Sequence, residues 1–323
     1  MNWIKYSILT LILSGSLLIL LFIGDIIAKR VLDLGQPIVY DSHPLWGYAP
    51  RENHTYERFD GDIVTINDVG ARGEKDWNNN GNNIIFLGDS VTYGGSYIGD
   101  NQTFASLSCQ TIENWTCHNV GVNAYGVLNM VARSRYDKRI SLAPLRIFTF
   151  ITGDFDRGLK DQDTAHFIMR EPPNYFSGLW EIMNFIAAKV NISPKHLFGK
   201  KSDIYDTELL DEAKRLKREF ALDVLTMELQ RLDQIGLEFL LVHSPRASEL
   251  DYTNIPKNNP ILRKLSNLYP DRFIFLSDIL ANHYKNGDKQ IYRDGLHYEV
   301  FGHILVSNYL SPIIAKNIKK DLK

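Results

Sequence analysis

The chain has 323 residues, of which 44% are hydrophobic and 23% are charged, and its formal net charge is −2. This composition excludes collagen-like, disordered and disulfide-scaffold proteins, and the length fits one large α/β domain or two small ones. The near-neutral balance lacks the clustered basic charge typical of nucleic-acid binding, so we expect no nucleic-acid partner.

The first predicted element is an apolar helix close to the N-terminus. Residues 6–24 carry no charge, and at about 1.5 Å per residue such a helix nearly spans a hydrocarbon core of about 30 Å. The stretch is long for a signal peptide and no clean small-x-small cleavage site follows it, so we favour an uncleaved anchor over residues 1–28. A buried core helix is disfavoured because no face of the segment is polar.

Residues 29–82 are predicted to form a tether and a strand-containing lead-in. The alternation of residues 63–67 is typical of a strand, and Gly70 and Gly73 mark turns. The remainder, residues 83–323, is predicted to be one domain.

Strands and helices alternate along this domain, and its strands are short apolar runs of the kind buried in parallel sheets. The order predicts a three-layer α/β/α sandwich with a mostly parallel five-stranded sheet. The predicted strands are residues 83–89, 118–122, 145–152, 236–244 and 272–278, and the predicted helices are residues 103–114, 127–138, 207–235, 260–269 and 298–318.

One segment, residues 157–206, interrupts the alternation and is rich in aromatic and aliphatic side chains. Three interpretations stay open: a lid or binding loop, a packed helical extension, or a segment on the bilayer surface. We favour the last least, because Lys and Arg are not enriched on a polar face.

The sequence contains two cysteines, Cys109 and Cys117. They could close a local disulfide, which requires an oxidising compartment, or they could be two buried free thiols. The positive charges that flank the apolar helix, Lys5 on one side and Lys29 and Arg30 on the other, barely decide its orientation.

The first candidate catalytic residue is Ser90, in the stretch GDSVTYGG of residues 88–95. It follows the first strand of the predicted sheet, and ligands of open parallel sheets bind outside the carboxyl ends of the strands. Gly88 permits a tight turn, and the backbone N–H groups after Ser90 could face a developing negative charge. Alone, Gly-Asp-Ser is a weak signal, since Asp and Ser are also ordinary helix caps.

The second candidate pair is Asp294 and His297, just before the last predicted helix. A serine hydroxyl needs a base, and that base needs orienting, which His297 and Asp294 could supply. Asp294 as a helix cap is the alternative. The spacing suggests no third metal ligand, so we predict no metal or cofactor. The G-x-S-x-G motif of ordinary α/β-hydrolases is missing from the sequence.

Together these stretches resemble the blocks of the SGNH (GDSL-type) hydrolase superfamily. Gly88-Asp89-Ser90 is similar to its first block, and Asp294-Gly295-Leu296-His297 to its last. The resemblance implies a flavodoxin-like SGNH fold and a Ser90–His297–Asp294 triad. The stretch NVGVNAYG, residues 119–126, is similar to the second block.

The resemblance also implies an oxyanion hole, with two departures from the family pattern. The second-block glycine falls on Ala124, with Gly121 as the other register, so the expected donors are the N–H groups of Ser90 and Ala124. The third block, usually G-x-N-D, corresponds to ITGDFDRG, residues 151–158, in which no Asn stands at the expected place. Gly153 and Asn123 are the less certain candidates for that role.

We therefore predict a serine esterase that acts on acyl esters, such as an acetylated cell-envelope glycan, through an acyl-enzyme. The alternatives are an O-acyltransferase with the same triad and a non-catalytic binding or scaffold protein of the same fold. We expect a single N-terminal helix to anchor it in the membrane, with the catalytic domain outside the cytoplasm, in the periplasm or the extracellular space.

Overall fold

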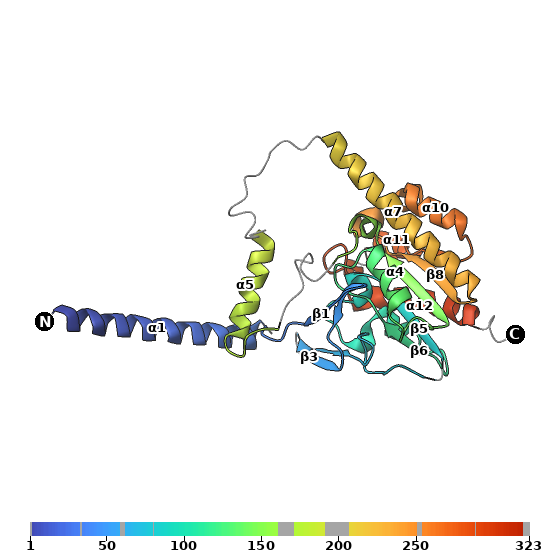
Figure 1. Ribbon diagram of the computed structural model, residues 1–323. Helices are drawn as coiled ribbons and strands as arrows, with labels where there is room; N and C mark the ends of the chain where they lie inside the picture. Colours follow the sequence, from blue (N-terminus) through green and yellow to red (C-terminus); the bar gives the residue numbers. More distant parts are fainter. Residues whose placement is uncertain are drawn as a thin grey trace.

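The computed structural model describes residues 2–32, 34–58, 62–79, 81–160, 171–190, 207–250, 254–287 and 289–318. A long N-terminal helix stands apart from an α/β body, and a shorter helix lies across the C-terminal end of the long one (Figure 1). The body confirms the predicted fold class.

A five-stranded parallel sheet forms the centre of the body, in the order β6-β5-β7-β8-β9. The strands are β5 (Asn83–Leu87), β6 (Thr116–Asn119), β7 (Leu145–Phe150), β8 (Glu238–His243) and β9 (Phe273–Phe275). β5 is the first strand of this sheet along the chain, and it pairs with a strand on each side. The chain therefore adds β6 on one side of β5, and β7, β8 and β9 on the other. Ligands of such sheets bind outside the carboxyl ends of the strands, where the order reverses.

Helices cover both faces of the sheet. One face packs against α4 (Val127–Tyr136), α7 (Thr207–Gln234) and α10 (Pro260–Leu268), which contribute to one buried apolar cluster. The other face packs against α3 (Phe104–Ser108), α11 (Ser277–Lys285) and α12 (Val300–Ile318), which contribute to the second. The alternation inside β5 sorts its side chains: Ile85 and Leu87 belong to the first cluster, Ile84 and Phe86 to the second.

The lead-in folds into two antiparallel hairpins, of which the sequence predicted one strand. They are β1 (Tyr40–His43) with β2 (Gly47–Pro50), and β3 (His54–Arg58) with β4 (Asp62–Ile66). Arg72 bridges Ile66 to Asn119, which connects the second hairpin with the end of β6. The remaining short helices are α2 (Ser90–Tyr93), α8 (Ala247–Leu250) and α9 (Asn254–Asn258), with 3-10 turns at Asp100–Gln102, Thr152–Asp156 and Lys289–Ile291.

Helix α1 (Asn2–Val31) is long and apolar enough to cross a membrane. Its candidate span, Trp3–Val31, is mostly exposed, unlike the core helix of a soluble protein. A signal sequence near an N-terminus can meet the same criteria of length and composition.

The interrupting segment contains a helix, α5 (Ser177–Val190), which packs against α1. The segment is thus helical over this part, which leaves its role open, while residues 161–170 and 191–206 of the segment lie outside the described residues. Three predictions were wrong in extent. The strand predicted over 118–122 is β6, which begins and ends earlier, at Thr116–Asn119. The helix predicted over 103–114 ends at Ser108. The strand predicted over 272–278 ends at Phe275, and α11 begins two residues later, at Ser277.

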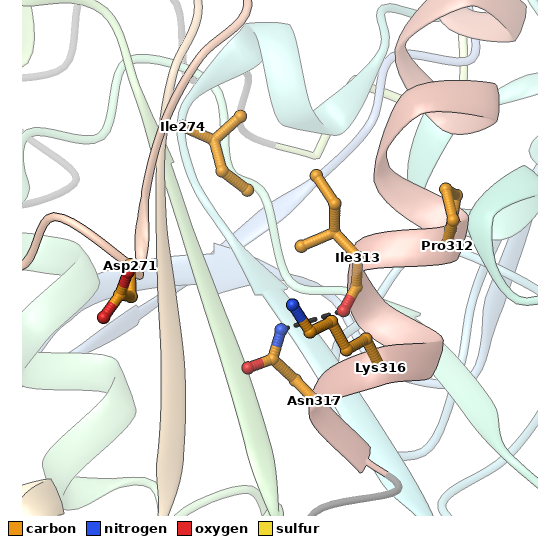
Figure 2. Close-up of a pocket in the computed structure, with 6 residues that line it drawn as sticks. All are labelled: Asp271, Ile274, Pro312, Ile313, Lys316 and Asn317. Carbon is orange, nitrogen blue, oxygen red and sulfur yellow. Dashed lines mark hydrogen bonds between the residues drawn. The ribbon is translucent and has the colours of Figure 1, made fainter.

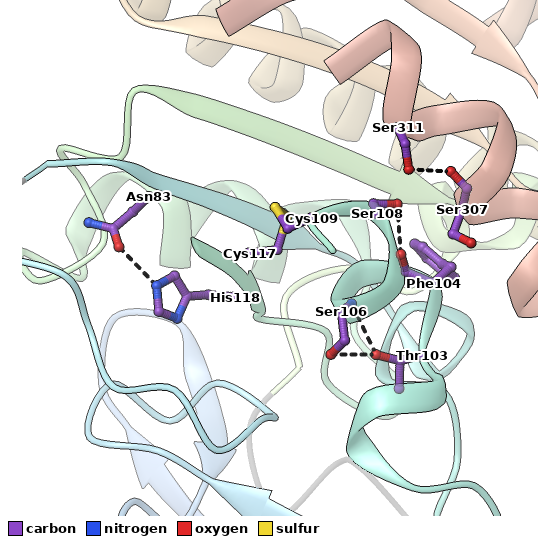
Figure 3. Close-up of a disulfide and its surroundings, with 10 residues drawn as sticks. All are labelled: Asn83, Thr103, Phe104, Ser106, Ser108, Cys109, Cys117, His118, Ser307 and Ser311. Carbon is purple, nitrogen blue, oxygen red and sulfur yellow. Dashed lines mark hydrogen bonds between the residues drawn. A yellow bond between two sulfur atoms is a disulfide. The ribbon is translucent and has the colours of Figure 1, made fainter. Parts of the chain in front are cut away.

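Cys109 and Cys117 form a disulfide, with their Cα atoms 5.7 Å apart (Figure 3). It joins the residue after α3 to β6, the edge strand of the sheet. The disulfide alternative of the sequence analysis is the one that the structure adopts.

Candidate active site

The candidate catalytic side chains gather at the carboxyl edge of the sheet. Ser90 follows β5, the second-block loop follows β6, Gly153 follows β7, and Arg246 follows β8. The loop before α12 brings His297 to the same edge. Residues that lie 207 positions apart in the sequence therefore meet in one site.

Ser90 is the first residue of α2 and is half-buried. Asp89 caps this short helix, and its Oδ1 accepts the Val91 N–H at 2.9 Å. Gly88 is required here because a Cβ would overlap Thr92 Oγ1 and would lie 2.7 Å from the Thr149 carbonyl oxygen. The turn thus packs directly on β7 and presents the Ser90 hydroxyl at the sheet edge.

His297 lies between Ser90 and Asp294. Its Nε2 is 2.8 Å from Ser90 Oγ, and its Nδ1 is 2.7 Å from Asp294 Oδ2. Asp294 Oδ1 also accepts the backbone N–H groups of Leu296 and His297, at 3.0 and 2.8 Å. Partial burial raises the pKa of Asp294, but these hydrogen bonds and the His297 ring outweigh it, so the pKa lies below its usual range.

This arrangement fixes the tautomer of His297. An ionised Asp294 can only accept, so Nδ1 must carry the imidazole proton, and the lone pair of Nε2 then faces the Ser90 hydroxyl. A hydroxyl that donates to a neutral imidazole is the geometry that general-base activation of a serine requires.

Beneath Ser90, a buried cluster joins the first and third blocks. Arg157 Nη1 lies 3.1 Å from Asp89 Oδ2 and 2.7 Å from Asp154 Oδ1, and it donates to the Tyr125 carbonyl at 2.7 Å. Burial and the nearby Asp89 carboxylate raise the pKa of Asp154, while Arg157 opposes the rise. The cluster holds the turns after β5, β6 and β7 together.

The structure separates the predicted oxyanion residues of the second block. The Gly121 N–H already donates to Asn119 Oδ1 at 3.1 Å, and a Cβ on Gly121 would lie 2.5 Å from the Tyr93 nitrogen, so this glycine packs against α2. The Asn123 side-chain amide donates to the Tyr40 hydroxyl at 2.8 Å, which occupies it on the lead-in side. Ala124 has a positive φ of 64°, a sparsely populated conformation for a residue with a Cβ.

Gly153 follows β7, in the stretch that resembles the third block. A Cβ placed on it would have open space except for Arg246 Nη2 at 3.6 Å and a methyl group of Ile151 at 3.9 Å. Arg246 also adjoins the His297 loop, because the next residue, Ala247, donates its N–H to the Gly295 carbonyl at 2.8 Å. Arg246 could not be singled out from the sequence, because a single arginine after a strand carries no recognisable pattern.

A hollow of about 660 Å³ lies elsewhere on the body, between β9 and the end of α12 (Figure 2). Asp271, before β9, and Asn317, near the end of α12, line it, and the Asn317 amide donates to the Ile313 carbonyl at 2.8 Å. Because Asp271 precedes the strand, the hollow opens at the amino edge of the sheet, opposite the Ser90 site.

Three buried histidines away from the triad predict an acid-sensitive fold. Burial lowers the pKa of His118 to about 4 and that of His243 and His303 to about 3. Between about pH 6.5 and pH 4 the unfolded chain binds a proton at each site and the folded chain does not, so stability falls as pH falls. Each site contributes a slope of about 1.4 kcal/mol per pH unit. Denaturant unfolding of the full chain in detergent, from pH 7 to pH 4.5, measures this.

His303→Gln should remove one proton from that slope. His303 is chosen because its Nδ1 accepts the Phe104 N–H at 3.1 Å, an acceptor role that glutamine can retain. A pH-independent stability over this range would contradict the buried neutral state of these rings.

No protein-family model and no curated protein sequence matches the chain. Solved structures similar to it include a two-domain esterase active on acetylated mannans, at 15% identity and a TM-score of 0.43, over 72% of this chain and 49% of that one. The chain thus spans about half of the length of that esterase.

A lipase/acylhydrolase from Enterococcus faecalis is similar at 14% identity and a TM-score of 0.41, over 73% of this chain and 96% of that one. A member of the lipolytic protein G-D-S-L family from Veillonella parvula is similar at 13% identity and a TM-score of 0.40, over 70% and 94%.

Proposed function

We propose that the chain is a serine esterase of the SGNH type, with Ser90 as nucleophile, His297 as general base and Asp294 as its orienting carboxylate. The observation that carries the proposal is the continuous hydrogen-bonded chain Ser90 Oγ–His297 Nε2 and His297 Nδ1–Asp294, at 2.8 and 2.7 Å. The sequence motifs independently select the same three residues.

In the proposed mechanism Ser90 Oγ attacks the ester carbonyl carbon while His297 Nε2 takes the hydroxyl proton. The tetrahedral intermediate collapses when the alcohol leaves with that proton, and an acyl-Ser90 ester remains. A water, deprotonated by His297, then attacks the acyl carbonyl and releases the acid. Asp294 stays ionised throughout and stabilises the imidazolium, in keeping with its lowered pKa.

For the oxyanion hole we propose the backbone N–H groups of Ser90 and Ala124, with the Arg246 guanidinium in place of the family's Asn side chain. Its support is the 3.6 Å approach of Arg246 Nη2 to the Cβ position of Gly153. A guanidinium is a charged donor, so it can stabilise a developing oxyanion at least as strongly as an amide.

Arg246→Ala should lower kcat for ester hydrolysis by about 10²-fold, the usual cost of one oxyanion donor, with a small change in KM. Adding Gly153→Asn to that variant should restore part of the rate, because the amide would enter the space that both residues leave open. Steady-state kinetics on p-nitrophenyl acetate measure both effects. A rate for Arg246→Ala within about threefold of the wild type would contradict a donor role for this residue.

The acyl acceptor is tested with the full chain in detergent and an acetylated glycan as donor. Release of free acetate supports the esterase, whereas transfer to an added glycan, seen as a mass gain of the acceptor, identifies an O-acyltransferase with the same acyl-enzyme. If the wild type turns over no faster than a Ser90→Ala variant, the chain is not an enzyme of either kind, and a binding protein of the same fold is the remaining interpretation.

We further propose that α1 anchors the protein in a membrane and that the body lies outside the cytoplasm. The Cys109–Cys117 disulfide supports this side, because disulfides persist in oxidising compartments. An alkaline phosphatase fused to the C-terminus should be active in cells. An inactive fusion, with an active cytoplasmic reporter at the same position, would contradict the orientation.

A further inference from the structure

Helix α5 is fixed to the C-terminal end of α1, and it runs across that end (Figure 1). Asp25 of α1 is buried, and its Oδ1 accepts the N–H groups of Gly178 and Leu179, in the first turn of α5, at 2.9 and 3.1 Å. Its other carboxylate oxygen pairs with Lys29 at 2.7 Å. A Cβ on Gly178 would lie 2.9 Å from the Ala28 Cβ, so glycine permits this close approach.

The two sides of α5 meet different parts of the chain. Leu179 lies 3.6 Å from the position that a Cβ on Gly24 would take, and the Phe176 ring packs edge-on against Phe22. Both partners belong to the uncharged stretch of α1. Glu181, two residues after Leu179, lies on the other side of the helix. Its Oε2 accepts the N–H of Gly35, a residue beyond the end of α1, at 2.6 Å.

The Leu179 side of α5 is an apolar face whose side chains are partly exposed to solvent. Leu179, Ile182, Met183 and Ile186 recur at the spacing of one helix face, and Met183 and Ile186 are 65% and 47% exposed. Because Leu179 shares this face, the face is turned toward the uncharged stretch of α1 rather than toward the tether.

We propose that α5 lies in the interface of the same bilayer that α1 crosses, with this apolar face in contact with lipid. The inference rests on α1 spanning the membrane, as proposed above. Residues 6–24 measure roughly 28 Å as a helix, close to the hydrocarbon thickness, so Asp25 and the attached α5 fall at the boundary of the core.

Interfacial helices usually carry their own basic residues, and α5 carries few; this was the sequence argument against a surface position. The structure provides basic charge from the neighbouring helix, because Lys29 and Arg30 form the last turn of α1 at the joint. The α1–α5 joint would then set the height at which the catalytic body stands over the membrane.

The test attaches an environment-sensitive fluorophore to a single introduced thiol in the full chain, in phosphatidylcholine–phosphatidylglycerol vesicles with or without brominated lipid. The native cysteines are joined in a disulfide and do not react with the thiol reagent. The test variant is Met183→Cys. Leu18→Cys, exposed at the middle of α1, reports insertion of the anchor, and Lys264→Cys, exposed on α10, reports water.

We expect brominated lipid to reduce the emission at position 183 by about twofold, as at position 18, and to leave position 264 unchanged. Adding Asp25→Ala, which removes the cap of α5, should weaken quenching at 183 and not at 18. Quenching at 18 without quenching at 183 would overturn the inference while the anchor stands. A label at 183 whose emission shows a dry environment but is not quenched by brominated lipid would also overturn the inference, because protein rather than lipid would then cover the face. Quenching at neither position would overturn both this inference and the anchor, and would leave the Ser90 chemistry to its own test.

Discussion

Ser90→Ala is expected to reduce kcat for ester hydrolysis by about 10⁴–10⁶-fold. The reason is that Oγ is the atom that forms the acyl-enzyme, and its 2.8 Å contact with His297 Nε2 is the route by which its proton leaves. The residual rate would come from binding and the remaining oxyanion donors. Rates of p-nitrophenyl acetate hydrolysis by the purified full chain measure the loss.

Because triad members act as a unit, Ser90→Ala and the double variant Ser90→Ala/His297→Ala should have similar rates. Asp294→Asn should cost about 10⁴-fold, because an amide in that position can favour the wrong imidazole tautomer. The matched control is Ser42→Ala, on the exposed side of β1, which should retain the full rate. A loss of less than tenfold in Ser90→Ala would contradict a covalent role for this serine.

Arg72→Ala is expected to reduce the free energy of unfolding by about 3–5 kcal/mol, the cost of breaking a buried ion pair from one side. Arg72 Nε pairs with Asp100 Oδ1 at 2.7 Å, with both side chains almost fully buried. The guanidinium also donates to the carbonyl oxygens of Tyr93, Gly95 and Ile98, on the loop that follows the Ser90 helix. Urea unfolding in detergent measures the change.

The loop that Arg72 holds continues directly from α2, the helix that begins at Ser90. Arg72→Lys retains the charge but not the planar set of donors, so its stability should lie between that of the wild type and that of Arg72→Ala. Arg215→Ala, which breaks exposed ion pairs on α7, should leave the urea midpoint unchanged. Equal midpoints for Arg72→Ala and Arg215→Ala would show that the Arg72 network does not stabilise the fold.

The sheet was predictable because its strands are short apolar runs that alternate with helical segments. The first hairpin was not predicted, because contacts of its tyrosines with distant parts of the chain hold it, rather than an alternating apolar pattern. Tyr48, for example, donates its hydroxyl to the Asn123 carbonyl at 2.7 Å.

The same distinction applies to the site. Ser90, Asp294 and His297 could be predicted because each stands in a short motif at an element boundary. Arg157 and Arg246 could not, because their partners come from other loops and only the folded sheet brings those loops together. The third-block departure, visible in the sequence as a missing Asn, needed the structure to show which side chain approaches Gly153.

The central claim, that Ser90 is an activated nucleophile, is tested most directly by covalent labelling with a fluorophosphonate. The phosphorus is attacked by an activated serine, fluoride leaves, and peptide mass spectrometry locates the adduct. We expect stoichiometric labelling at Ser90 in the full chain and none in the His297→Ala variant, which retains the serine but loses its base. Labelling elsewhere, or labelling of Ser90 that does not depend on His297, would contradict the proposed triad.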